Sequence, residues 1–239
     1  MAKGNWRDEL GRDMRRIVKD KGIGAFLDVA QEMLNVDARG DGKQKAQFVG
    51  EVCEIVNMEL TKQYLALSGN KGTIFQSCVL HDLKNPKSDF RTELDTVLVT
   101  PYFLLTSECK SYSGELVITG QGTFTHRGME ADVYKQSLLH HTHLMRYGEQ
   151  LTMPELKLPK PPVFANAFVF SNAKIIDKRS REAESRLRVV TTSELIAYLD
   201  AMFKKYNKPV FDYERAVKIF GTCSRSRKLH AQHAEFVGY

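Results

Sequence analysis

TELDTVLVTPYFLLTSECKSYSG, residues Thr92–Gly114, decides the fold because it contains two apolar strands that meet at a short turn. The first apolar run ends at Thr100 and the second begins at Phe103, so Pro101 and Tyr102 make the turn. Along each strand, successive side chains point to opposite faces, and every second residue shares a face. The stretch therefore predicts an antiparallel β-hairpin with a defined pairing of its side chains.

The register of this hairpin decides which charged side chains meet. If Thr100 lies opposite Phe103, the pairing runs back along both strands and places Asp95 directly opposite Glu108. Opposed side chains on one face have Cβ atoms about 4.5–5.5 Å apart, so two carboxylates there repel each other. A hard divalent cation such as Mg²⁺ or Mn²⁺ between them reverses that effect. A three-residue loop would instead place Asp95 opposite Cys109, with the carboxylates on opposite faces.

Lys110 lies two residues beyond Glu108 and therefore on the same face of the strand. A lysine beside a metal-bound water orients the water, stabilises its deprotonated form and screens the charge of an attacked phosphate. Two carboxylates, a metal and a lysine suit in-line hydrolysis of a phosphodiester. On an exposed strand, however, the same Glu-x-Lys triplet is an ordinary solvated ion pair, and the triplet alone leaves both interpretations open.

The composition is that of an ordinary soluble globular protein, with 239 residues of which 42% are hydrophobic and 27% charged. No apolar run approaches the ~20 residues needed to span a bilayer. The N-terminus has no apolar core like that of a secretory signal, and the four cysteines show no CxxC spacing. We therefore expect a cytoplasmic protein with reduced thiols and no membrane association. The net charge of +6 mildly favours a polyanionic partner.

Patterns of helices and strands divide the chain into three parts. Residues 1–42 predict a helical N-terminal extension, residues 43–205 a mixed α/β domain, and residues 206–239 a basic helical C-terminal extension. In the middle part, the order of elements predicts a mixed, mainly antiparallel central sheet flanked by helices. Its expected helices cover residues 43–68, 130–147 and 193–203, the last one capped by Ser193; its expected strands cover residues 73–80, 94–100, 103–110, 163–170 and 186–191, with a further hairpin over residues 115–125.

Four separated motifs in sequence order resemble the nuclease-related domain (NERD) family of the PD-(D/E)xK nuclease superfamily. They are Gly50-Glu51 on the first helix, the hairpin of Thr92–Gly114, the Q-x3-H-x3-L pattern of Gln136, His140 and Leu144, and the last two strands followed by Glu194-Leu195. The resemblance covers about residues 45–205. It implies a restriction-endonuclease-like core and a nuclease activity that depends on Mg²⁺ or Mn²⁺.

The resemblance also implies a set of metal-binding groups. Asp95 and Glu108 would bind the metal together with the backbone carbonyl of Cys109, a residue that stands where the family commonly has threonine. Glu51 would assist in placing the metal or the attacking water. An ordinary solvated helix glutamate is the alternative interpretation of Glu51.

Two further residues complete the site that the resemblance implies. Lys110 would be the activating lysine. Gln136 would support the site or touch the phosphate backbone, and its alternative is a helix glutamine satisfied by main-chain contacts.

Two classes of function follow from these observations. The first is a metal-dependent deoxyribonuclease that hydrolyses phosphodiester bonds in DNA. The second is a catalytically silent nucleic-acid-binding or interaction module of the same fold. The intact acid-acid-lysine set favours the first, because a module that does not cut has no evident need for it. The expected partner is nucleic acid, DNA in particular, and the sequence is compatible with a homo-oligomer.

Two polar segments outside the hairpin suggest other interpretations. His140, His141 and His143 come close together in an expected helix, but no nearby Cys or Glu completes a zinc site, so we expect core or surface histidines. Segment Asp177–Arg188 mixes charges of both signs, and we expect a solvated turn or helix between two strands.

Overall fold

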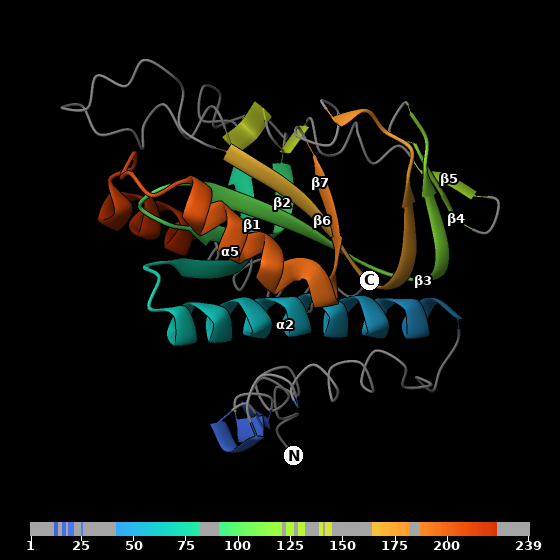
Figure 1. Cartoon of the computed structure of the whole chain (residues 1–239), viewed down its shortest axis with the longest axis horizontal. Helices are drawn as coiled ribbons and strands as arrows, with labels where there is room; N and C mark the ends of the chain where they lie inside the picture. The colour runs from blue at the N-terminus through green and yellow to red at the C-terminus, as the bar shows by residue number, and fades with distance from the viewer. Residues whose placement is uncertain are drawn as a thin grey trace, which may run out of the picture.

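The computed structural model describes the sheet, the helices packed against it and short parts of the remaining chain (Figure 1). The described residues are 12–13, 16–17, 19–21, 25, 42–81, 91–120, 123–126, 129–131, 139–140, 142–144, 164–181 and 187–223.

The strand β3 (Leu104–Ile118) is the centre of the sheet, because three other strands pair with it. The strand β2 (Arg91–Val99) lies antiparallel beside its first residues, and β4 (Phe124–His126) lies antiparallel beside its last ones. The strand β6 (Phe164–Asp177) runs parallel to β3 along both halves, with an irregularity after Lys110.

Three outer strands complete the sheet. They are β1 (Thr73–His81) beside β2, β5 (Met129–Ala131) beside β4, and β7 (Arg188–Thr191) beside β6. Of the six pairings in the described part of the chain, four are antiparallel and two are parallel. The predicted mixed, mainly antiparallel sheet is thereby confirmed.

The turn of the β2–β3 hairpin has the predicted two residues. The Thr100 N–H donates to the carbonyl of Phe103 over 3.1 Å, and the hydroxyl of Thr100 accepts the N–H groups of Tyr102 and Phe103 at 3.1 and 2.8 Å. A side-chain oxygen that satisfies the turn's own N–H groups stabilises a tight turn. Pairs Val99↔Leu104 to Thr96↔Ser107 follow from it, which confirms the predicted register.

Helices cover both faces of the sheet. The long helix α2 (Gly42–Ser68) and the helix α5 (Leu195–Lys205) pack on one face, where Leu98 and Leu105 enter a common core with them. Figure 1 shows α2 along that side, with α5 next to it. On the other face, Leu104 packs with Leu144 and with the helical residues 213–223. The alternating side chains of β3 therefore separate two cores.

Several element boundaries differ from the sequence predictions. The strand β3 joins the expected strand of residues 103–110 to the first arm of the hairpin expected over residues 115–125, and β4 is the second arm of that hairpin. The strand β6 extends seven residues further than expected, because β3 supplies it with a long parallel partner. The helix expected from Glu130 is wrong at its start, where Met129–Ala131 form β5. A short 3₁₀ helix, Thr192–Glu194, precedes α5, and the cap is Thr191, whose N–H donates to Glu194 Oε2 over 2.8 Å. Ser193 is therefore not the cap.

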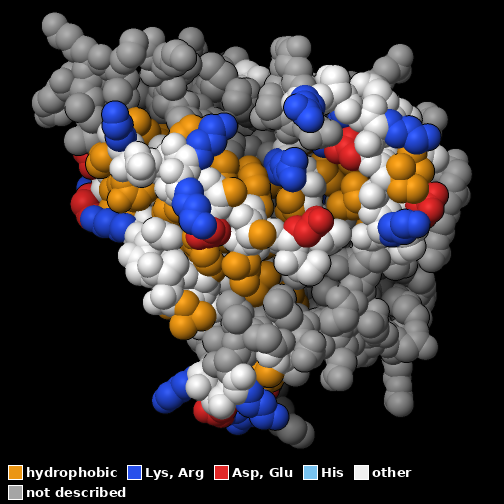
Figure 2. Space-filling model, in the orientation of Figure 1, with side chains coloured by type: hydrophobic (Ala, Val, Ile, Leu, Met, Phe, Trp, Pro, Cys, Tyr) orange, Lys and Arg blue, Asp and Glu red, His pale blue; other side chains and the backbone are white. Residues whose placement is uncertain are grey.

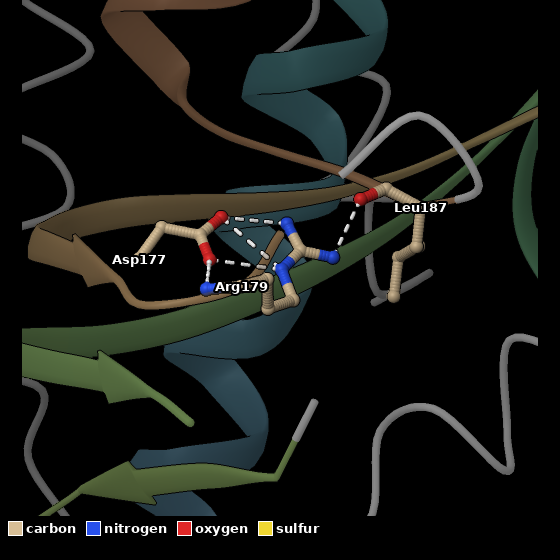
Figure 3. Close-up of polar contacts among 3 residues, drawn as sticks. All are labelled: Asp177, Arg179 and Leu187. Carbon is tan, nitrogen blue, oxygen red and sulfur yellow. Dashed lines mark hydrogen bonds and ion pairs between the residues drawn. The ribbon is translucent and has the colours of Figure 1, made fainter. Parts of the chain in front are cut away.

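The segment between β6 and β7 is only partly solvated, contrary to expectation. Lys178, Ser180 and Arg181 are exposed, but Arg179 is buried, with 7% of its surface accessible. Its guanidinium donates to both carboxylate oxygens of Asp177 at 2.6–3.2 Å and to the carbonyl of Leu187 at 2.8 Å (Figure 3). Arg179 therefore joins the two ends of the connection and fixes where β7 begins.

Substitution of Arg179 by Met is expected to lower the free energy of unfolding by about 3 kcal/mol. It leaves the carbonyl of Leu187 without its donor and removes the guanidinium from the carboxylate of Asp177, which keeps the backbone N–H of residue 179. Urea denaturation measures this change. Arg181→Met, at an exposed position, is the matched control and should alter stability by less than about 0.5 kcal/mol. Equal stability of the two variants would show that the buried contacts of Arg179 contribute nothing.

Candidate active site

The β2–β3 ladder stops beside the predicted carboxylates. In the described parts of both strands, Thr96↔Ser107 is the last pair, although β2 extends back to Arg91 and β3 runs on to Ile118. One further step of the same register places Asp95 opposite Glu108. At that step a side-chain contact replaces the backbone pairing, since Asp95 Oδ2 accepts the N–H of Cys109 over 2.8 Å.

The neighbouring strand β1 is irregular at the same level. Ser77 has a φ of 55°, a left-handed conformation that is uncommon for a residue other than glycine, and it is skipped in the pairing of β1 with β2. On β2, Leu94 and Val97 both enter the same core although they are three residues apart. Regular alternation forbids this, so the strand is rotated around Asp95. The rotation explains how Asp95 reaches along the sheet to a backbone N–H of β3.

Burial raises the pKa of Asp95 to about 7, and the negative charge of Glu108 adds to the increase. The hydrogen bond from Cys109 opposes this rise but is outweighed. The two carboxylates are thus near enough to repel each other, as the hairpin register predicted. A proton or a cation is needed to remove the repulsion.

Lys110 forms an ion pair with Glu108. Its Nζ lies 2.6 Å from Glu108 Oε1, and Glu108 is only 6% exposed. Burial alone would lower the pKa of Lys110, but the charge of Glu108 and its hydrogen bond raise that pKa above the ordinary value. The ammonium group therefore stays protonated at neutral pH. The side chain of Lys110 remains 28% exposed, so this pair is neither fully buried nor the solvated surface pair of the alternative interpretation.

His140 lies on the other side of Glu108. Its Nδ1 is 3.9 Å from Glu108 Oε2, and the residue is 5% exposed. Burial lowers the pKa of His140, while the charge of Glu108 acts in the opposite direction and is outweighed. The burial of His140 agrees with the expectation of a core histidine, but its position beside Glu108 was not predicted from the sequence. Its spacing before Leu144, in a motif already noted, was the signal that could have found this position.

The helix α2 brings another carboxylate toward the site. Glu54 Oε2 accepts a hydrogen bond from Gln76 Nε2 over 3.2 Å, and its charge contributes to the raised pKa of Asp95. Glu51 was the helix carboxylate predicted from the sequence, and Glu54 was not predicted. Glu54 lies three residues further and therefore on a neighbouring part of the helix surface. The side chain of Glu51 and the whole of Gln136 lie outside the described residues, so their roles stay predictions.

Behind the site, Cys109 is anchored to α2. The Nδ2 group of Asn57 donates to the carbonyl of Cys53 at 2.8 Å and lies 3.7 Å from the sulfur of Cys109. Both thiols are buried. A hydrogen bond with Cys53, together with burial, raises the pKa of Cys109, which keeps this thiol protonated. The side chain of Cys109 thus fixes the strand position whose N–H holds Asp95.

The described residues contain no group of three or more His, Cys, Asp and Glu side chains arranged to hold a metal ion. The predicted hard-cation site stays untested by this finding, because it combines two carboxylates with a backbone carbonyl and with Glu51, whose side chain lies outside the described residues.

A family model described as the nuclease-related domain matches residues 50–171, just over half of the 239 residues. The chain belongs to the nuclease-related domain (NERD) family. The match contains Glu51, Asp95, Glu108, Lys110 and Gln136, and it ends within β6. The resemblance inferred from the sequence extended further, to residue 205. The family belongs to the PD-(D/E)xK superfamily, and the mixed sheet between helices is consistent with the restriction-endonuclease-like core expected of it.

The comparisons with individual proteins add little to this assignment. The crystal structure of protein VC1899 from Vibrio cholerae is similar with a TM-score of 0.40 and 14% sequence identity, over 84% of this chain and 50% of that one. The NERD chain therefore spans about half the length of that protein. No curated protein matches the sequence. Among the described helices, none is long and apolar enough to cross a membrane.

Raising the pH from about 4 to 7 in the presence of a chelator is expected to lower the free energy of unfolding through Asp95. The unfolded carboxyl loses its proton near pH 3.9, about three units below the pKa of about 7 in the folded protein. Between these values only the unfolded state has released the proton. Each pH unit therefore lowers the free energy of unfolding by at most about 1.4 kcal/mol. Above pH 7 this contribution no longer changes.

Urea denaturation of the wild type and of Asp95→Asn across this pH range isolates the contribution, because the variant cannot titrate at position 95. From pH 4 to pH 7 the unfolding free energy of the wild type should fall relative to that of Asp95→Asn. A constant difference would contradict a raised pKa for Asp95.

Proposed function

We propose that this NERD protein is a metal-dependent nuclease that hydrolyses phosphodiester bonds in DNA at Asp95, Glu108 and Lys110. The observation that carries the proposal is the meeting of two carboxylates at the end of the hairpin ladder, with a protonated lysine bonded to one of them. An acid pair of this kind, with Glu108 buried and Asp95 half-buried, destabilises the fold unless a proton or cation compensates it. Such an arrangement is typical of a site that performs chemistry.

Asp95 and Glu108 fit a hard divalent cation such as Mg²⁺ or Mn²⁺. Their oxygens are the donors that such ions prefer, and a positive charge between them would remove the repulsion that raises the pKa of Asp95. The backbone carbonyl of Cys109 and the carboxylate of Glu51 are the further ligands that family membership suggests. When bound, the cation would polarise the phosphate and acidify a bound water.

The residues of the chain perform the remaining tasks. The N–H of Cys109 holds Asp95 in place, so one metal ligand is oriented before substrate arrives. Lys110 is protonated and 28% exposed, and it can therefore donate a hydrogen bond to an oxygen of the attacked phosphate. Release of Lys110 from Glu108 frees the carboxylate oxygen that it occupies at 2.6 Å. We propose that metal binding to Glu108 and phosphate binding to Lys110 support each other for this reason.

The attacking group in this proposal is water rather than a side chain. Cys109 lies in the middle of the motif, but its thiol is buried and protonated, since a hydrogen bond with Cys53 and burial raise its pKa. An inert thiol is a poor nucleophile. Hydrolysis by an activated water is therefore the reaction that these residues support best.

A polyanionic substrate agrees with the charge of the protein. The net charge is +6, and Figure 2 shows Lys and Arg side chains at several places on the face that carries α5. Arg188 at the start of β7 and Lys205 at the end of α5 are exposed. Positive side chains bind the phosphates of nucleic acids without regard to sequence.

Replacement of Lys110 by Met is expected to reduce DNA cleavage by about 100-fold or more, because it removes the cation that stabilises the attacked phosphate while keeping the hydrocarbon stem. Cleavage is measured on labelled single-stranded, double-stranded and supercoiled DNA with Mg²⁺, Mn²⁺ or EDTA. Lys208→Met, at an exposed position after α5, is the matched control and should cut like the wild type. EDTA should abolish the activity of both.

A wild type that cuts no DNA and binds no divalent cation would overturn the proposal. The remaining function would then be the catalytically silent module, and DNA binding without cleavage would be its signature. Cleavage that persists in EDTA, or in Lys110→Met at the wild-type rate, would show that the activity comes from another site.

A further inference from the structure

Glu108 lies between two side chains that face different oxygens of its carboxylate. Lys110 Nζ is 2.6 Å from Oε1, and His140 Nδ1 is 3.9 Å from Oε2. Glu108 and His140 are 6% and 5% exposed, so bulk water has little access between the carboxylate and the imidazole. The position of the imidazole therefore bears directly on the orientation of Glu108.

His140 is held in this position by packing. It precedes Leu144 by one helical turn, and Leu144 is fully buried in the core formed by Val97, Leu104 and the helical residues 213–223. On the same short segment, Leu139 and Thr142 are exposed. The buried side of the segment thus faces the sheet surface that carries Glu108, and Leu144 sets how closely His140 approaches it.

We propose that His140 is a positioning residue that orients Glu108 for binding of the divalent cation, an inference that rests on the nuclease function proposed above. Oε1 of Glu108 is taken by Lys110 in this structure, and a cation held by Glu108 would compete with the lysine for the carboxylate and turn it. An N–H group of His140 directed at Oε2 gives the carboxylate a second fixed partner as it turns. Such a hydrogen bond to a metal-binding carboxylate orients it and strengthens metal binding.

The separation of 3.9 Å is longer than a hydrogen bond. Hydrogen bonds of catalytic groups are often long in unliganded proteins and tighten when the ligands bind. A rotation of the Glu108 carboxylate away from Lys110 changes the position of Oε2 without any movement of the helical segment. His140 acts through Glu108 in this proposal and does not contact the metal.

The test is isothermal titration of the full chain with Mn²⁺ alone, which does not depend on catalysis. His140→Leu should bind Mn²⁺ about 10- to 100-fold more weakly than the wild type, as expected when a partner of a metal ligand is removed. His140→Asn should bind within about threefold of the wild type, because its amide N–H replaces Nδ1. Leu139→Met, at an exposed position of the same segment, is the control and should bind like the wild type.

Thermal unfolding establishes that each variant is folded. Should His140→Leu fail to fold, the comparison is made between His140→Asn and His140→Gln, whose longer amide does not reproduce the position of Nδ1. Weaker binding by the glutamine variant alone supports the proposal, and equal binding by both overturns it.

The outcomes separate this inference from the proposed function. Mn²⁺ binding by folded His140→Leu at the wild-type affinity overturns the positioning role and leaves the nuclease proposal standing. Equal weakening in His140→Leu and Leu139→Met also overturns it, because a change at an exposed position of the segment would then have the same effect as loss of the imidazole. A wild type that binds no Mn²⁺ overturns the nuclease proposal itself, and the positioning role with it.

Discussion

The hydrogen bond from the N–H of Cys109 to Asp95 is the interaction on which the rest of the site depends. It uses the backbone donor of β3 just beyond the last pair of the β2–β3 hairpin, so the ladder ends at Ser107 while β3 continues beside β6. The end of the ladder is the position at which two carboxylates can meet inside a sheet. In a continuous hairpin the backbone would take up this N–H, and Asp95 would lose the donor that holds its carboxylate beside Glu108.

The sequence predicted this hairpin well because the information is local. Thr100 satisfies the turn's N–H groups, and the two-residue turn then determines every pair that follows. The helix α2 was equally evident from its apolar stripe and from Gly69, which has a positive φ of 68° just after the helix ends at Ser68. The hairpin register and the strand alternation supplied Lys110 and both carboxylates, and the family motifs agree with them. The ion pair of Lys110 with Glu108 and the repulsion between Glu108 and Asp95 agree with the predicted register.

Features that depend on distant parts of the chain could not be predicted in the same way. Nothing in the local pattern indicated that Arg179 would be buried, since its partner carbonyl on Leu187 is brought near only when β6 and β7 pair. Glu54 and His140 reach the site from opposite faces of the sheet, through helix packing rather than through spacing in sequence. The sequence predicted two separate strands where β3 is continuous, because the parallel partner β6 pairs with both halves of it.

The contact between Cys53 and Cys109 has a consequence for how this family can diverge. Asn57 lies 3.4 Å from one sulfur and 3.7 Å from the other, so the three side chains share one closely packed volume behind the carboxylates. A larger or smaller residue at either cysteine changes the space left for the other two. The three positions are therefore expected to covary among related chains. Substitutions of Cys53 on α2 would therefore be limited by the strand β3, which carries Glu108 and Lys110.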